Sequence, residues 1–271
     1  MPALSPLDAP LFFDAELPST MDAARWRAMS GGVHGTLVLA RQQTGGRGRY
    51  GNSWTSTEGG LYLSMLVRPT LETSADDWRS RTLPWLALQA TLAMHRVVAP
   101  LLASLGEQNP PPLGIKWPND LYRGDKKLSG VLVEAGADPQ QQPFAIIGLG
   151  LNVHQDPAQL PPTATSLALA GVDSLPSLAA LARGWREQFF ALPTSGEGLT
   201  AAIHERLLGL GTPVTIGWRT EEQTTPEKQK TASGRLVGVG DQAQAILEDT
   251  GGNRITVSEG HLLNWSTWTT S

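Results

Sequence analysis

The chain has 271 residues, no cysteine and a formal net charge of −4 at pH 7, from 21 Lys and Arg against 25 Asp and Glu. This length supports one large core and a small second domain. The lack of cysteine excludes disulfides, a thiol nucleophile and cysteine-ligated zinc. The dispersed basic residues argue against nucleic-acid binding. No apolar run approaches the ~20 residues that span a bilayer, and the N-terminus lacks a secretion signal, so we expect a cytoplasmic protein without membrane contact.

The first part of the chain alternates helical and extended patterns. Residues 21–29 are typical of a helix, and Ser19 or Thr20 is a suitable cap for it. Residues 36–40 and the β-rich run 61–67 are typical of strands. Between these two strands lies the sequence Gly-Arg-Gly-Arg-Tyr-Gly-Asn-Ser-Trp, residues 46–54, which we call the arginine loop.

The arginine loop has the composition of an anion-binding loop. Its glycines let the backbone N–H groups approach a ligand, and each guanidinium offers a rigid fork of donors to phosphate or carboxylate. The glycines also match the dinucleotide-binding pattern G-x-G-x-x-G, but that pattern requires a helix after the loop, and a β-rich run follows here. Taken alone, the loop is equally compatible with a mobile surface loop whose arginines keep it soluble.

The middle of the chain contains a second polar cluster. A long helix is expected over residues 85–105, ending at Gly106, and the proline-rich segment 109–112 leads into a strand, turn and strand. A hairpin of this kind brings Lys116, Asp120 and Lys127 together. The apolar strand 146–153 follows, with two glycines that allow a flat ligand to lie against the backbone.

The sequence pattern changes in the last part of the chain. Residues 178–190 have apolar positions at helical spacing, so we expect a helix packed on the sheet, and residues 165–169 are candidates for lining the same site. Short strands and turns then follow at 213–218, 232–239, 243–247 and 254–257. This change predicts two domains, residues 1–210 and residues 211–271.

These blocks together resemble the biotin protein ligases. The arginine loop resembles the family's GRGRRGRxW signature, residues 116–121 match KWPNDL, residues 127–134 are similar to KLAGILVE, residues 148–153 resemble GxGxN, and residues 19–21 resemble its short S-T-N/M element. The blocks occur in the family's order from about residue 11 to the C-terminus. Gln43 matches the family's glutamine, whereas Gly45 stands where alanine is usual, and Tyr50 and Asn52 replace two arginines.

The resemblance implies a fold and a reaction. The fold is α+β, a mixed sheet flanked by helices, with a small C-terminal SH3-like barrel. In the reaction, biotin attacks the α-phosphate of ATP, with Mg²⁺ as cofactor, to give biotinyl-5′-AMP and pyrophosphate, and a lysine of a biotin carboxyl carrier protein then attacks this anhydride. Neither step needs an enzyme nucleophile, so positioning and positive charge carry the catalysis. The ligand-binding region begins within the first twenty residues, so we expect the monofunctional class without an N-terminal helix-turn-helix. A homodimer is left open.

The resemblance also implies site residues. Lys127 is expected at the biotin carboxylate and α-phosphate, with Arg47 and Arg49 closing over them and Asp120 as the fourth catalytic candidate. The expected biotin-binding residues are Ser19, Thr20, Met21, Gln43, Gly46, Arg47, Gly48, Arg49, Lys127 and Gly130. The expected ATP-binding residues are Arg47, Arg49, Trp54, Lys116, Asn119 and Asn152. None of the five histidines has metal-ligand spacing, so no protein-held metal is expected.

Several alternatives remain open. Asp120 is a candidate to orient Lys116, to hold magnesium through water, to accept a proton from the acceptor lysine, or only to stabilise a turn. Trp54 and Trp117 are candidates for stacking on ligand rings, although such residues are more often in the core, and Asn152 is a candidate either to face the adenine or simply to close a strand. At the level of function, a lipoate ligase on a similar fold and a non-catalytic biotin sensor are the competing hypotheses. The octanoyl-transferase branch needs a cysteine, and a sensor is expected to lose Lys127 or the arginines.

Overall fold

The computed structural model describes residues 5–69, 73–194, 196–218 and 230–265. A seven-stranded central sheet has the order β1-β2-β3-β7-β6-β5-β4. Its strands are β1 (Leu11–Leu17), β2 (Leu37–Gln43), β3 (Gly60–Val67), β4 (Leu113–Lys116), β5 (Asp120–Arg123), β6 (Lys126–Ala137) and β7 (Pro143–Asn152). β1 and β2 are parallel and the remaining neighbours are antiparallel, so the sheet is mixed, as predicted.

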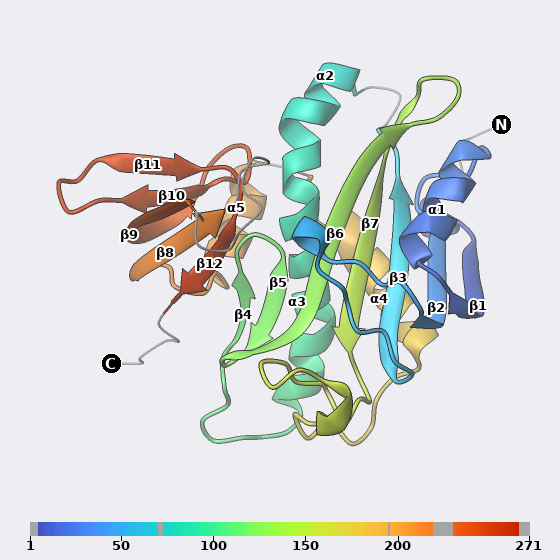
Figure 1. Ribbon diagram of the computed structural model, residues 1–271, viewed down its shortest axis with the longest axis horizontal. Coiled ribbons are helices and arrows are strands. Elements are labelled where there is room, and N and C mark those ends of the chain that lie inside the picture. Colours follow the sequence, from blue (N-terminus) through green and yellow to red (C-terminus); the bar gives the residue numbers. More distant parts are fainter. Residues whose placement is uncertain (1–4, 70–72, 195, 219–229, 266–271) are drawn as a thin grey trace.

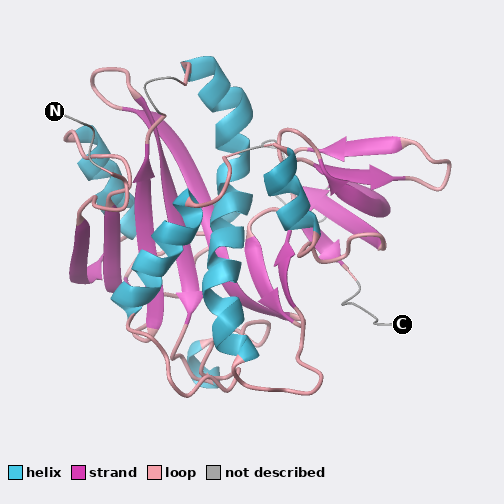
Figure 2. Ribbon diagram, turned by 180° about the vertical axis from the view of Figure 1, so that it is seen from behind, coloured by secondary structure: helices cyan, strands magenta, loops and turns pink. Residues whose placement is uncertain are grey.

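Helices cover both faces of the central sheet (Figures 1 and 2). α1 (Thr20–Met29) lies on one face, and α3 (Leu86–Ala103) and α4 (Leu178–Phe190) lie on the other. β2 shows why both faces need cover, because successive side chains of a strand point to opposite faces. Val38 packs in the cluster under α1, whereas Leu37 and Leu39 pack in the cluster with α3 and α4. The predicted helices 21–29 and 178–190 are confirmed.

The helix predicted over residues 85–105 corresponds to α3, but short helical segments directly precede α3 in the chain. Two short turns, η2 (Trp78–Thr82) and η3 (Leu83–Trp85), precede α3, and the short helix α2 (Ala75–Asp77) precedes both. Pro84 lies in the first turn of η3, where the missing N–H costs no helical hydrogen bond. Gly106 follows the helix with a φ of 63°, a conformation that favours glycine, so the predicted end is confirmed.

A second, five-stranded antiparallel sheet occupies the C-terminal part and is called the C-terminal sheet. Its order is β11-β10-β9-β8-β12, consistent with the SH3-like fold expected. The strands are β8 (Pro213–Trp218), β9 (Lys230–Val239), β10 (Ala245–Glu248), β11 (Arg254–Val257) and β12 (His261–Asn264). Two elements were not predicted: β12, and the helix α5 (Glu197–His204), which precedes β8 in the chain.

The C-terminal sheet is attached to the β4–β5 edge of the central sheet (Figure 1). Two buried indoles donate hydrogen bonds to one of its turns, from Trp85 Nε1 to the Asp241 carbonyl and from Trp117 Nε1 to the Ala243 carbonyl, each at 2.8 Å. A single apolar cluster includes side chains of both sheets. The division at residues 210 and 211 therefore stays a prediction, and the predicted domain ends at residues 1–4 and 266–271 lie outside the described residues.

One helical stretch in the described part of the chain is long and apolar enough to cross a membrane. It runs from Trp78 to Ala103. An apolar 18-residue segment of it has a mean hydropathy of 1.4, and 56% of that segment is buried inside the molecule. α3 in this stretch packs against the central sheet and α4. Burial of this kind is typical of the core helix of a globular protein.

Candidate functional site

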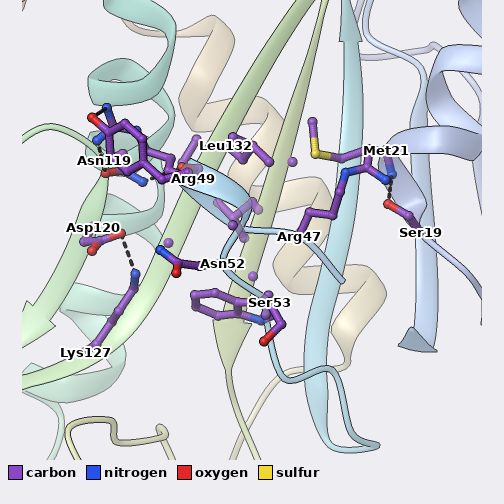
Figure 3. A pocket seen from close by; sticks show the side chains of 18 of the residues that line it. Ser19, Met21, Arg47, Arg49, Asn52, Ser53, Asn119, Asp120, Lys127 and Leu132 are labelled. Atoms are coloured by element: carbon purple, nitrogen blue, oxygen red, sulfur yellow. Dashed lines mark hydrogen bonds and ion pairs between the residues drawn. The ribbon is translucent and has the colours of Figure 1, made fainter. Parts of the chain in front are cut away.

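A cavity of about 240 Å³ lies where the arginine loop crosses the central sheet (Figure 3). Residues from α1, β2, the arginine loop, β3 to β7 and the C-terminal sheet surround it. They are Ser19, Thr20, Met21, Gln43, Arg47, Gly48, Arg49, Tyr50, Asn52, Ser53, Trp54, Leu63, Lys116, Asn119, Asp120, Lys127, Gly130, Val131, Leu132, Gly148, Leu149, Gly150 and His261. The cavity therefore collects the sequence blocks singled out above into one place.

The predicted catalytic, biotin-binding and ATP-binding residues line this cavity except Gly46 and Asn152, and the candidate segment 165–169 contributes no lining residue. Gly46 packs tightly behind the loop, since a Cβ there would lie 2.5 Å from both Ser56 Oγ and the Trp54 carbonyl. Asn152 is 3% exposed, and its amide donates to the Thr165 carbonyl at 2.9 Å. The structure therefore gives Asn152 the second role left open for it, closing a strand, rather than a contact with the cavity.

A buried polar network joins α1 to the sheet at one end of the cavity. Gln43 Oε1 accepts from the Thr20 backbone N–H at 2.8 Å and from Thr20 Oγ1 at 3.0 Å, while Gln43 Nε2 donates to Ser56 Oγ at 2.9 Å. Thr20 Oγ1 also shares a 2.8 Å hydrogen bond with Ser64 Oγ. Ser19 caps α1, because its Oγ accepts from the Met21 N–H at 3.2 Å. Satisfied networks of this kind fix the position of their polar atoms.

Trp54 lies flat against the glycines of the sheet. A Cβ on Gly150 would lie 2.4 Å from Trp54 Cε2, and a Cβ on Gly130 would lie 2.8 Å from Trp54 Cζ3. The flat group that packs on Gly150 is therefore an indole of the chain itself, whereas a Cβ on Gly148, the other glycine of this strand, would lie 2.7 Å from Met21 Sδ; contact of the two glycines with a flat ligand stays a prediction. Trp54 Nε1 is buried without a hydrogen-bond partner among the described residues, and a Cβ on Gly150 would lie 2.5 Å from it. Trp117, by contrast, is 1% exposed and belongs to the core.

Gly150→Ala is expected to lower the free energy of unfolding by about 1–3 kcal/mol, because the added Cβ overlaps a rigid ring that packs against it. The matched control is Gly184→Ala in α4, where the nearest atom to the new Cβ is 3.9 Å away. That substitution is expected to be neutral or stabilising by about 0.5–1 kcal/mol, since alanine favours a helix. Denaturant unfolding of both variants checks this, and equal stability of the two contradicts the packing account.

Lys127 and Asp120 form an ion pair across β5 and β6, with Lys127 Nζ 2.7 Å from Asp120 Oδ1 (Figure 3). The predicted convergence of these two residues with Lys116 is confirmed, since Lys116 and Asp120 are cross-strand partners in β4 and β5. Lys127 Nζ also lies 5.2 Å from the centre of the Trp54 ring. The contact that the geometry shows for Asp120, holding the Lys127 ammonium in place, was not among the roles predicted for it, and those roles stay predictions.

Arg47 points at α1 and not into the middle of the cavity (Figure 3). Its two terminal nitrogens contact the two carboxylate oxygens of Asp22, each at 2.8 Å, and one of them is 3.4 Å from Glu134 Oε1. The hydrogen bond from Arg47 holds the pKa of Asp22 below its ordinary value. The predicted closure of Arg47 over phosphate therefore differs from the arrangement seen, in which Asp22, outside the matched blocks, and Glu134, the last residue of the block 127–134, engage this guanidinium.

Arg49 joins the arginine loop to two distant parts of the chain. Its Nη1 donates to the Gly260 carbonyl at 2.9 Å and to Asn119 Oδ1 at 3.3 Å, and its Nη2 donates to Tyr50 Oη at 3.1 Å. Tyr50 has a φ of 57°, which lets the loop turn back on itself at this point. The C-terminal sheet therefore takes part in holding the loop closed over the cavity.

Lys116 is a largely buried cation at the end of β4. Burial lowers the pKa of Lys116 to about 8, and the charge of Lys127 acts in the same direction while Asp120 opposes it. Its Nζ lies 4.1 Å from the centre of the Trp265 ring and 5.1 Å from that of Tyr122. Tyr122 lies in β5 of the central sheet and Trp265 directly follows β12 of the C-terminal sheet, so Lys116 lies at the junction of the two parts.

Sequence patterns did not identify every residue of the site. His261 lines the cavity from β12, and Asp22 engages Arg47 from α1, but neither belongs to a motif. Within the described residues, no group of three or more His, Cys, Asp or Glu side chains is arranged to hold a metal ion. The site therefore combines cations and a polar network around one cavity.

Comparison with known proteins assigns this arrangement to a family. Residues 17–152 match the model of the biotin/lipoate A/B protein ligase family. A biotin–[acetyl-CoA-carboxylase] ligase of Mycobacterium tuberculosis is 33% identical over 243 residues, covering 88% of this chain and 82% of the relative. The bifunctional ligase/repressor BirA of Bacillus subtilis is 36% identical over 170 residues, and the match spans only 48% of its length.

Solved structures agree with this assignment. A biotin protein ligase from Aquifex aeolicus, in complex with biotin and ATP, superposes with a TM-score of 0.68 at 26% identity, covering 95% of this chain and 99% of that one. A biotin protein ligase from Leishmania major, in complex with biotinyl-5-AMP, has a TM-score of 0.57 at 25% identity. The chain belongs to the biotin/lipoate A/B protein ligase family.

Proposed function

We propose that this protein is a biotin protein ligase, which activates biotin with ATP to biotinyl-5′-AMP and transfers biotin to a lysine of a carrier protein. The observation that carries the proposal is the cavity itself, which Lys127, Arg49 and Lys116 line beside the polar network of Thr20 and Gln43. Two anions that repel each other are brought together there by fixed positive charge. The relatives with biotin and ATP in their names or complexes support the choice of substrates.

The residues have distinct proposed roles. Lys127 holds the biotin carboxylate against the α-phosphate, and a compact ammonium suits a charge that moves between the two. Arg49 keeps the loop closed and shields the anhydride from water. Arg47 is proposed to act through Asp22, fixing the loop to α1. Thr20 and Gln43 present polar groups to the biotin ring system, and Lys116 faces the phosphates of ATP.

The finer features of the assignment are also proposals. Mg²⁺ is proposed to bind together with the ATP phosphates. Asp120, the carboxylate of the cavity nearest to Lys127, is proposed to lie close to this ion. A biotin carboxyl carrier protein is the proposed acceptor, because the relative from Mycobacterium tuberculosis carries the name of an acetyl-CoA-carboxylase ligase. A cytoplasmic location and a homodimeric state are also proposed.

The test of function follows pyrophosphate release from purified protein with ATP, magnesium and either biotin or lipoate. We expect release with biotin only. Release with lipoate alone indicates a lipoate ligase, and binding of biotin without any release indicates a sensor. Either result contradicts the proposal. The assay reads pyrophosphate release, and isothermal titration calorimetry measures the binding of biotin separately.

The KM for ATP is expected to rise as the pH is raised above about 8. Lys116 is charged below its pKa of about 8 and neutral above it, so its attraction for phosphate is present at low pH and is lost as the pH rises through that value. Steady-state kinetics between pH 6.5 and 9.5 measure this. In Lys116→Met the KM for ATP is expected to be higher at every pH and not to rise above pH 8. If the KM of this variant rises as in the wild type, another group causes the pH dependence.

A further inference from the structure

The Lys116 ammonium differs from the neighbouring cations of the site in what it contacts. Lys127 is paired with Asp120 and Arg47 with Asp22, both at less than 3 Å. In contrast, the Lys116 ammonium takes part in no hydrogen bond or ion pair with the described residues, although it lines the cavity and is largely buried. A buried charge normally has a partner, so its environment needs another explanation.

Two aromatic rings surround this ammonium. Tyr122 and Trp265 meet edge to face, with their ring centres 5.3 Å apart and their planes at 82°, and Lys116 Nζ lies within about 5 Å of both ring centres. The face of an aromatic ring attracts a cation through its quadrupole. Because a ring accepts no strong hydrogen bond, the three N–H donors of the ammonium stay available for an anion.

Trp265 comes from the segment that directly follows β12, far from the rest of the site in sequence. It also packs against the apolar cluster shared by the two sheets. Its indole N–H is buried without a hydrogen-bond partner among the described residues, a cost that a purely apolar side chain would avoid. The position of this tryptophan is therefore explained by the face of its ring better than by packing alone.

We propose that Trp265 is a positioning residue for the ligase reaction, which holds the Lys116 ammonium at the cavity so that it binds the departing pyrophosphate end of ATP. The inference rests on the proposed function. A carboxylate in the place of the ring would neutralise the lysine and compete with the incoming phosphates. The ring holds the cation without competing, and the C-terminal sheet thereby gains a part in nucleotide binding.

The proposal is tested by measuring the Kd for pyrophosphate and the KM for ATP in three proteins: the wild type, Trp265→Leu and Trp265→Phe. The leucine variant keeps an apolar side chain but loses the ring, so pyrophosphate binding is expected to weaken about 3-fold to 30-fold. The phenylalanine variant keeps a ring face and is expected to recover most of the loss. The KM for biotin is expected to stay unchanged in both variants.

A double-mutant cycle separates positioning from general stability. In a Lys116→Met background, Trp265→Leu is expected to have no further effect on pyrophosphate binding, because the cation on which it acts is gone. Leu263→Ala is the matched control, since this side chain is two residues away and 43% exposed. Should Trp265→Leu fail to fold, Trp265→Met is the second variant without a ring.

Two results overturn the inference. The first is equal pyrophosphate affinity of the wild type and the leucine variant, and the second is a loss that persists undiminished in the Lys116→Met background. Neither result touches the proposed function, because that fails only when the wild type itself releases no pyrophosphate with biotin and ATP. The two failures are therefore distinguishable in one set of proteins.

Discussion

Lys127→Ala is expected to lower the rate of adenylate formation by roughly 100-fold to 1,000-fold, the range for removal of one preorganised electrostatic contact. The ammonium lies 2.7 Å from Asp120 and close to the Trp54 ring, so it has a fixed place before substrate arrives. Removing it leaves the biotin carboxylate and the α-phosphate without the positive charge that offsets their repulsion. Biotin-dependent pyrophosphate release in single turnovers measures the effect.

The control for this prediction is the neighbouring Lys126→Ala. Lys126 is exposed and lies outside the cavity, so its removal is expected to change the rate by less than about 2-fold. Circular dichroism and thermal unfolding of Lys127→Ala are expected to resemble those of the wild type, since the side chain is partly exposed. Normal turnover by Lys127→Ala removes this residue from the mechanism.

Arg49→Gly is expected to release activated biotin into solution. Arg49 connects the arginine loop to Asn119 and to the Gly260 carbonyl of the C-terminal segment. Loss of these charged hydrogen bonds, each worth about 1.5–3 kcal/mol, is expected to raise the dissociation rate of biotinyl-5′-AMP by roughly 10-fold to 100-fold. The escaped anhydride then reacts with lysines of unrelated proteins.

The measurement is the labelling of a bystander protein, such as serum albumin, mixed with the variant, the carrier protein, ATP and biotin. Arg41→Ala is a suitable control, because Arg41 is exposed and pairs only loosely with Glu58, at 3.6 Å. It is expected to leave the bystander unlabelled, as is the wild type. Labelling by Arg49→Gly that stays confined to the carrier contradicts the retention role.

Much of the fold follows from local pattern. The helix predicted over residues 178–190 coincides with α4, because apolar side chains recur there at helical spacing and Ser177 caps its N-terminus. The strand predicted over 213–218 coincides with β8. Missed elements were short or without periodicity. β12 has four residues, and α5 has eight, with a glycine at its N-cap that makes no side-chain hydrogen bond.

The site residues that lie on neighbouring strands were predictable from the sequence. Lys116, Asp120 and Lys127 lie on three consecutive antiparallel strands, so short spacing in sequence places them together. Contacts made across the fold were not predictable. Arg49 is 211 residues from Gly260, and nothing in either segment indicates that they meet. The engagement of Arg47 by Asp22 was missed for the same reason, since its carboxylate comes from the exposed side of a helix.

A crystal structure with biotin and a non-hydrolysable ATP analogue tests the central claim most directly. The claim is that the cavity under the arginine loop holds the biotin carboxylate and the α-phosphate together. We expect Lys127 Nζ within hydrogen-bonding distance, about 2.7–3.2 Å, of a biotin carboxylate oxygen, with the loop closed over it. Biotin bound elsewhere, or with its carboxylate beyond the reach of Lys127, contradicts the account.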